Sequence, residues 1–312
     1  MKIAVTGALG HIGSYIIRNL ASNVKNIEFL LLDNFLTQRY SSLFSLNRDT
    51  KYKFYEIDVS VSNLDSLFND IDIVIHLAAI TDAANSFNNS NEVERNNLQA
   101  TKNVANSALN TDTKLIFLSS TSVYGTQKDV VDEDCSEEEL MPQSPYAETK
   151  LREEELIASL GLKGLQYICC RFGTIFGVSQ GMRFHTAVNK FCWQAVMGQE
   201  ISVWETAFDQ SRPYLDLYDA SRAFGHIINN DIFDNETYNV LTRNATVRDV
   251  TQAIEKLIPD LKIAFVKNKI MNQLSYEVLS RKFENSGFNF KGSLEKGIED
   301  TINIIVNSNR SK

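Results

Sequence analysis

The sequence lacks any tract of basic residues. Its 312 residues carry 31 Lys and Arg against 39 Asp and Glu, which gives a formal charge of -8 at pH 7. Proteins that bind nucleic acid or anionic membranes need clustered Lys and Arg to meet the phosphates. An acidic chain without such clusters argues against both kinds of partner.

Long hydrophobic runs are also missing. A helix that spans a bilayer needs about 20 apolar residues, and no run here approaches that length. The chain opens directly on the strand-like Lys2–Val5, without the charged and apolar regions of a signal peptide. We therefore expect no membrane association and a cytoplasmic location.

Cysteine and histidine are scarce, with four residues of each. The cysteines have neither metal-site spacing nor the pattern of a disulfide-rich domain. Cys169 and Cys170 lie in an apolar run that is typical of a core strand. The histidines are not spaced as a metal set either, so the sequence predicts no bound metal.

Repeats and low-complexity linkers are absent, and the composition is that of an ordinary globular α/β protein. In residues 1–177, short apolar runs alternate with helical patterns, which predicts a doubly wound parallel sheet of the Rossmann type. The expected strands are Lys2–Thr6, Asn26–Asp33, Lys53–Asp58, Asp72–Leu77, Lys114–Ser119 and Leu165–Arg171. The expected helices are His11–Ser22, Val61–Asn69, Asn91–Leu109 and Ser144–Leu160.

The rhythm changes after Gly177, and residues 178–312 are expected to form a smaller C-terminal α/β lobe. Part of the segment 212–242 should return to the first domain, with the strand Thr237–Leu241 in the main sheet. The other elements expected here are a helix at Phe184–Met197, a strand at Glu200–Trp204, an extended segment at Arg212–Leu217, a helix from the Thr246 N-cap to Leu257, and a helix at Ser293–Val306.

A glycine-rich loop follows the first strand and opens the first helix. Gly7 permits the tight turn, Gly10 lets the backbone approach a pyrophosphate, and Gly13 lets helix and strand pack closely. His11 and Ile12 lie in the first helical turn, whose free N–H groups and positive dipole end favour phosphate. This arrangement predicts a dinucleotide site.

Asp33 ends the second strand, 20 residues after Gly13. A carboxylate at this place accepts hydrogen bonds from the adenosine ribose and repels the 2′-phosphate of NADP. With the glycine loop, Asp33 predicts that the cofactor is NAD.

Tyr146 and Lys150 are four residues apart, which on a helix places both side chains on one face. A lysine ammonium would lower the pKa of the tyrosine, so that the phenolate could take a proton from a substrate hydroxyl. Ser120 lies at the carboxyl end of the fifth strand, where open α/β sheets bind ligands, and its hydroxyl could bind the reacting oxygen.

With these residues the chain resembles the extended short-chain dehydrogenases, specifically the NAD-dependent nucleotide-sugar epimerase/dehydratase family. The resemblance covers nearly the whole chain and follows ordered motifs. They are Thr6–Gly13, His76–Ala79, Asn97 with Thr101 and Asn103, Ser120–Gly125, Tyr146–Lys150, Arg171–Gly177 and Arg212–Asp219.

The resemblance implies residue roles, with Ser120, Tyr146 and Lys150 as the catalytic triad. It implies residues 1–177 as the NAD-binding domain, 178–312 as the substrate-binding lobe, and a homodimer that pairs the helices Asn91–Leu109 and Ser144–Leu160. Further implied cofactor contacts are Asn34, Asp58, Val59, Leu77, Ala78, Ala79 and Asn97. The implied nucleotide-sugar contacts are Thr81, Ser120, Tyr124, Tyr146, Thr174, Asn189 and the diphosphate-binding Arg212.

Several positions depart from the family's common patterns. The 4,6-dehydratases of the family carry an Asp-Glu pair after the triad Ser/Thr, where this chain has Thr121 and Ser122. Thr174 replaces a usual Asn, Gly173 replaces its aromatic neighbour, and a second substrate arginine is missing near 272–274. The block 181–184 resembles a less common subgroup that acts on nucleotide-linked hexoses or heptoses.

These features predict a nucleotide-sugar 4-epimerase that oxidises carbon 4 and returns the hydride to the other face. A net dehydrogenase that releases a keto-sugar would use the same triad, and the sequence hardly separates the two. A non-catalytic NAD-sensing protein is a third hypothesis, but it would be expected to carry a broken triad.

Overall fold

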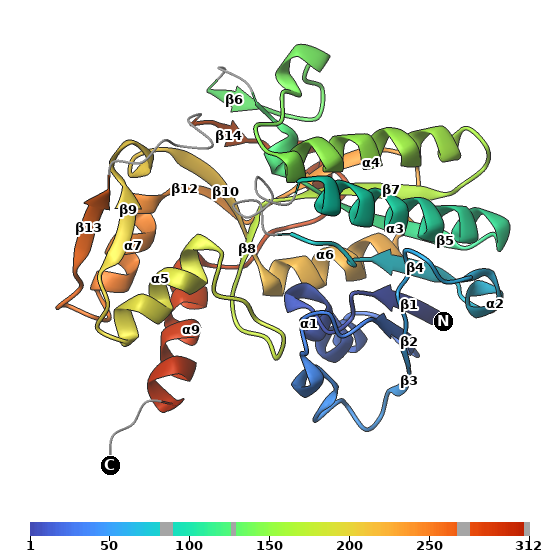
Figure 1. The fold of residues 1–312 in the computed structure, drawn as a ribbon, viewed down its shortest axis with the longest axis horizontal. Coiled ribbons are helices and arrows are strands. Elements are labelled where there is room, and N and C mark those ends of the chain that lie inside the picture. Colours follow the sequence, from blue (N-terminus) through green and yellow to red (C-terminus); the bar gives the residue numbers. More distant parts are fainter. Residues whose placement is uncertain (82–89, 126–128, 267–274, 309–312) are drawn as a thin grey trace.

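The structure is a computed structural model that describes residues 1–81, 90–125, 129–266 and 275–308. Its centre is a sheet of seven parallel strands in the order β11-β7-β5-β4-β1-β2-β3 (Figure 1). The expected Rossmann-type α/β fold is therefore confirmed. The strands are β1 (Lys2–Thr6), β2 (Glu28–Asp33), β3 (Lys51–Glu56), β4 (Ile73–His76), β5 (Lys114–Ser120), β7 (Tyr167–Phe172) and β11 (Thr237–Val240).

Helices cover both faces of this sheet, which is why its central strands are apolar along their length. On one face α1 (His11–Asn19) packs beside α6 (Leu217–Asn229), and on the other α3 (Ser90–Asn110) packs beside α4 (Pro145–Gly161). The first pair shares a buried core with Val5, and the second shares one with Ala4. The alternation of adjacent residues between two cores is the period-two pattern of a strand.

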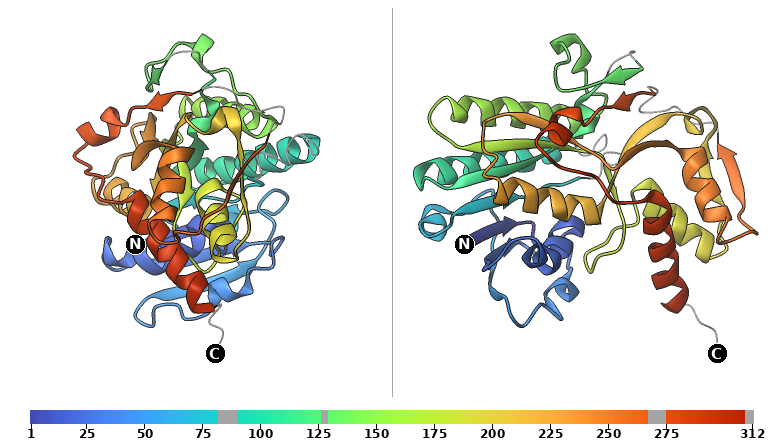
Figure 2. Two further views of the ribbon diagram at one scale, coloured as in Figure 1. Left: turned by 90° about the vertical axis from the view of Figure 1, so that its left-hand side faces the viewer. Right: turned by 180° about the vertical axis from the view of Figure 1, so that it is seen from behind.

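In the described part of the chain the second lobe holds smaller sheets and three helices, and the right-hand view of Figure 2 shows it as a body beside the main sheet. Its core is a cluster of buried side chains that includes Phe176, Phe191 and Ile298. Its elements are β8 (Thr174–Phe176), β10 (Ser211–Asp216) and β12 (Arg243–Thr246) in one sheet, β9 (Ile201–Trp204) with β13 (Ile263–Val266) in another, and the helices α5 (Ala187–Val196), α7 (Val247–Glu255) and α9 (Leu294–Ser308).

The remaining elements are short. They are α2 (Asp65–Phe68), α8 (Arg281–Asn285), the paired strands β6 (Val130–Val131) and β14 (Glu277–Val278), and the 3-10 turns η1 (Leu20–Ser22), η2 (Tyr40–Leu43), η4 (Thr121–Val123), η5 (Glu137–Glu139) and η6 (Glu205–Ala207). The helix expected at Val61–Asn69 is limited to α2. No helix in the described ranges is long and apolar enough to cross a membrane.

The helix α6 is the main element that the sequence analysis missed. The side chain of Asp216 accepts a hydrogen bond from the Tyr218 amide and so caps its amino end. Leu217, Ala220 and Phe224 follow at helical spacing and are fully buried or nearly so. The extended segment expected at Arg212–Leu217 corresponds to β10, except that Leu217 is the first residue of α6.

Candidate active site

A cavity of about 420 Å³ opens at the carboxyl ends of β1, β2, β4 and β5, where the second lobe meets the sheet. Ligands of open α/β sheets bind at this edge. Most of the residues that the sequence singled out line it. They are Gly7, Gly10, His11, Ile12, Gly13, Asp33, Asn34, Asp58, Val59, Leu77, Ala78, Ala79, Thr81, Ser120, Tyr146, Lys150, Thr174 and Arg212.

The glycine loop is shaped for a close approach of its backbone to a ligand. Gly7 has a φ of 63°, a left-handed value that favours glycine. A Cβ on Gly13 would lie 2.5 Å from the carbonyl oxygen of Gly7, so only glycine fits there. Gly10 is the N-cap residue of α1 and offers no side-chain cap, which leaves amide N–H groups of the first turn for an anion. These features fit the pyrophosphate of a dinucleotide.

Asp33 and Asp58 lie at the β2–β3 end of the cavity. The carboxylate of Asp33 accepts hydrogen bonds from the amides of Leu9 (3.1 Å) and Phe35 (3.0 Å). Burial raises the pKa of Asp33, while these bonds and the nearby Arg39 oppose the rise. Burial would also raise the pKa of Asp58, but hydrogen bonds from Ser60 and Asn34 lower it overall. Both arrangements leave carboxylate oxygens at the cavity wall.

The buried His76, the last residue of β4, supports the cavity wall that follows this strand. Its Nδ1 lies 2.7 Å from Thr6 Oγ1, and that oxygen accepts hydrogen bonds from the amides of Leu77 (3.1 Å) and Ala78 (3.2 Å). Burial lowers the pKa of His76 to about 3, so the ring is neutral at physiological pH. Thr6 and His76 therefore hold the backbone of the segment that lines the cavity.

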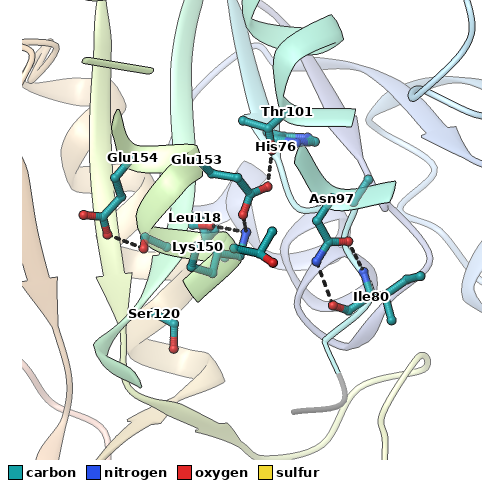
Figure 3. A network of polar contacts seen from close by, with 12 residues as sticks. His76, Ile80, Asn97, Thr101, Leu118, Ser120, Lys150, Glu153 and Glu154 are labelled. Carbon is teal, nitrogen blue, oxygen red and sulfur yellow. Dashed lines mark hydrogen bonds and ion pairs between the residues drawn. The ribbon is translucent and has the colours of Figure 1, made fainter. Parts of the chain in front are cut away.

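The helix α4 presents Tyr146 and Lys150 to the cavity. Ser144 caps this helix by accepting a hydrogen bond of 3.2 Å from the Ala147 amide, and proline occupies its first position. The ammonium of Lys150 donates to the Leu118 carbonyl at 3.0 Å and lies 3.0 Å from a carboxylate oxygen of Glu153 (Figure 3). These contacts fix Lys150 one helical turn beyond Tyr146.

Tyr146 experiences opposing influences on its ionisation. Burial raises the pKa of its phenol, Lys150 lowers it, Glu153 raises it, and Arg183 and a hydrogen bond from Ser120 lower it. Ser120 ends β5, and its hydroxyl also accepts from the Ser122 hydroxyl at 2.9 Å. The structure thus brings the three residues of the expected triad to one cavity.

Three predicted residues are not brought to the cavity wall. The side-chain amide of Asn97 forms two hydrogen bonds with the backbone of Ile80, of 2.8 and 2.9 Å (Figure 3). The Tyr124 hydroxyl is buried between Arg171 and Asn239, and burial raises its pKa. Asn189 is fully buried and bonds the backbone of Gly177 and Arg183. All three support neighbouring segments. Positions 272–274, where the family's second substrate arginine is missing from this chain, lie outside the described residues.

Several further residues of the cavity wall had no role assigned from the sequence. They include Arg183, His185, Thr186 and Tyr276. Arg183 stands in the block 181–184 that already set this chain apart from common family patterns, and that block was the available signal. The guanidinium of Arg212 lies 5.5 Å over the ring of Tyr276, a pairing that only the fold could reveal because the two residues are 64 positions apart.

Known proteins resemble this chain in sequence and in fold. A family model described as the NAD dependent epimerase/dehydratase family matches residues 3–240. A trifunctional UDP-glucose 4,6-dehydratase/UDP-4-keto-6-deoxy-D-glucose 3,5-epimerase/UDP-4-keto-L-rhamnose-reductase of Arabidopsis thaliana is 28% identical over 96% of the chain, which spans only 46% of that relative. The chain therefore spans about half the length of this curated relative.

Two further relatives match along their whole length. A putative UDP-glucose 4-epimerase of Methanocaldococcus jannaschii is 26% identical, covering 99% of this chain and 100% of its own. The crystal structure of the UDP-glucose 4-epimerase of Thermotoga maritima, solved with UDP-glucose, superposes with a TM-score of 0.85 at 23% identity over 99% of both chains. The structural match supports the fold, and the family model covers most of the chain.

Proposed function

The chain belongs to the NAD-dependent epimerase/dehydratase family, an enzyme family with NAD as its cofactor, and from this premise we propose that it is a nucleotide-sugar 4-epimerase. The observation that carries the proposal is the meeting of Ser120, Tyr146 and Lys150 with the glycine loop at one cavity. Gly7, Gly10, Gly13 and Asp33 would hold the dinucleotide, and the triad would face the sugar.

NAD held by the glycine loop and Asp33 would supply the acceptor for a hydride from sugar carbon 4 and the donor that returns it. Tyr146 takes the proton from the carbon 4 hydroxyl as the carbon is oxidised, and later returns a proton to the oxygen. The ammonium of Lys150 favours the phenolate by its charge. Ser120 donates a hydrogen bond to the reacting oxygen, which stabilises the charge that develops on it.

The distribution of acids in the cavity favours epimerisation over loss of water. Among the described residues that line it, the only carboxylates are Asp33 and Asp58. The strand β2 is three places from β5 in the sheet, which at about 4.8 Å per strand puts Asp33 roughly 14 Å from the strand of Ser120. The positions after Ser120 hold Thr121 and Ser122, whose hydroxyls bond Phe172 and Ser120. Acid-base elimination of water lacks its groups there.

A net dehydrogenase that releases a keto-sugar is the second candidate, because it uses the same triad and the same first half-reaction. The intact set of Ser120, Tyr146 and Lys150 speaks against the third hypothesis, a non-catalytic NAD-sensing protein. The homodimer through α3 and α4 stays a prediction, and so does the cytoplasmic location.

The decisive experiment follows the hydrogen on carbon 4. The enzyme is incubated with a panel of nucleotide sugars deuterated at that carbon, and the products are identified by NMR. An epimerase yields product that keeps the label and consumes no external NAD. Loss of the label from the sugar, with a keto-sugar accumulating, would replace the first candidate by the dehydrogenase.

The variant Tyr146→Phe tests the mechanism that both candidates share. It should fold and bind NAD but lose about 10²–10⁴-fold in turnover, the usual contribution of a positioned proton-transfer group. Near-normal turnover by this variant would refute the role of the phenolate in either reaction.

A further inference from the structure

We propose that Glu153 is a positioning residue that holds Lys150 and sets the pH range in which the Tyr146–Lys150 pair works. The inference rests on the proposed function for the role of the pair. It concerns a carboxylate that the sequence analysis did not single out and that does not line the cavity.

Glu153 is fully buried one turn after Lys150 on α4. Its Oε2 atom lies 3.0 Å from Lys150 Nζ, and the exposed fractions of the two side chains are 1% and 6%. Its Oε1 atom accepts a hydrogen bond from the Thr101 hydroxyl on α3 (Figure 3). An ion pair so buried is costly to form, because both charges leave water. Since this costly ion pair includes Lys150 of the triad, we infer that it serves the reaction.

Two contacts hold the ammonium of Lys150 at the cavity wall. It donates a hydrogen bond to the Leu118 carbonyl and forms the ion pair with Glu153. Because Lys150 lines the cavity, Glu153 helps to fix the position of its charge there.

A chain of hydrogen bonds extends from Glu153 to the cavity wall after β4. Because the Thr101 hydroxyl gives its hydrogen to the carboxylate, its oxygen must accept from His76 Nε2, which lies 3.1 Å away. His76 Nδ1 is then an acceptor for the hydroxyl of Thr6, which itself accepts from the Leu77 and Ala78 amides. The hydrogen bond that Glu153 accepts from Thr101 therefore sets the tautomer of His76 and the direction of the whole chain.

The charge of Glu153 acts on both members of the pair. Burial disfavours the ammonium of Lys150, but Glu153, with Tyr146, raises its pKa above the ordinary value. The same carboxylate raises the pKa of the Tyr146 phenol. Because the two groups are coupled, their protons leave in two steps that belong to the pair. Removing the negative charge should move both steps to lower pH.

The other titratable groups around the pair do not take over this role. His76 on β4 is neutral, and burial raises the pKa of the Cys169 thiol on β7 well above its ordinary value, so the thiol is neutral too. Arg183 faces Tyr146 from the segment after β8 and carries a constant positive charge. Glu153 is then the negative charge that acts on both Lys150 and Tyr146.

The test is the variant Glu153→Gln, which keeps the shape of the side chain and removes its charge. The pH profile of turnover should shift to lower pH as a whole, by about one unit, since an opposite charge at this distance changes a pKa by about 1–3 units. The value of kcat should change more than the KM for the sugar nucleotide. The matched control is Glu155→Gln on the exposed side of the same helix, which should leave the profile in place.

A second measurement needs neither cofactor nor substrate. The ultraviolet absorbance of tyrosinate is titrated in the protein without NAD, and the curve of the same protein with Tyr146→Phe is subtracted. The Tyr146 phenolate should appear at lower pH in Glu153→Gln than in the wild type. An inactive wild type would refute the proposed function, whereas this titration would still decide the role of Glu153.

The variant Glu153→Asp guards against a failure of the Gln variant to fold. It keeps the charge but withdraws it by one methylene, so its profile should lie between those of the wild type and Glu153→Gln. Profiles that keep the wild-type position while activity or stability falls would reduce Glu153 to a structural residue and overturn the proposal.

Discussion

The backbone amide of Gly181 donates a hydrogen bond of 2.8 Å to the hydroxyl of Ser14, and so joins the segment after β8 to the first helix of the sheet. A Cβ on Gly181 would lie 2.2 Å from the Leu9 carbonyl oxygen and 2.6 Å from that of Gly10. A second tie runs from His11 Nε2 to the Gly177 carbonyl at 2.9 Å. The glycine loop is therefore held between the first strand and the start of the second lobe.

This contact predicts that Gly181→Ala weakens NAD binding. The added methyl meets backbone atoms that cannot rotate away, so the loop must shift, at a cost of about 1–3 kcal/mol. We expect a lower affinity for NAD by calorimetry together with a lower free energy of unfolding. Gly198→Ala is the control, because Gly198 has a φ of 66° with no atom within 4 Å of its Cβ. It should cost stability alone, and equal losses of NAD affinity in both variants would contradict the prediction.

A second prediction concerns the choice between NAD and NADP. The carboxylate of Asp33 would face a 2′-phosphate, and like charges brought together cost several kcal/mol. NAD should therefore bind at least about tenfold more tightly than NADP in calorimetric titrations. Asp33→Asn should reduce the ratio of the affinity for NAD to that for NADP. Arg39→Ala should increase it, because Arg39 is the cation near Asp33 that could pair with the phosphate. Equal affinities in the wild type would show that Arg39 outweighs Asp33.

A third prediction concerns Arg212, which lines the cavity over the ring of Tyr276. Its Nη1 atom donates to the Ser211 carbonyl and its Nη2 atom to Gln210, both at 2.9 Å, so the guanidinium is oriented before substrate arrives. If it binds the diphosphate, Arg212→Ala should lower sugar-nucleotide affinity by about 1.5–3 kcal/mol, the value of a charged hydrogen bond.

NAD affinity should be nearly unchanged in this variant, since Arg212 belongs to the second lobe. Arg248→Ala is the matched control, because Arg248 also covers an aromatic ring, that of Phe208, but pairs with Asp209 outside the cavity. A Michaelis constant that stays at the wild-type value in Arg212→Ala would mean that the diphosphate is bound elsewhere.

The parts of the site that follow a strand directly could be read from the sequence. Gly7 comes straight after β1 and Asp33 ends β2, and a parallel sheet brings all its carboxyl ends to one edge. Tyr146 and Lys150 could be paired because both lie in one helix, where four residues make about one turn. In each case local spacing is enough to fix the relative position, so no long-range contact has to be known.

The tertiary structure decided what depends on contacts between distant segments. In the sequence, Glu153 cannot be distinguished from the neighbouring acidic residues of its helix. The packing of α3 against α4 buries it beside Thr101. The meeting of Gly181 with the glycine loop likewise depends on how the second lobe folds back onto the sheet. The sequence by itself determined the strands of the main sheet, the glycine loop and the helical pairing of Tyr146 with Lys150. Burial and long-range packing, which no local spacing encodes, decided which charges act on that triad.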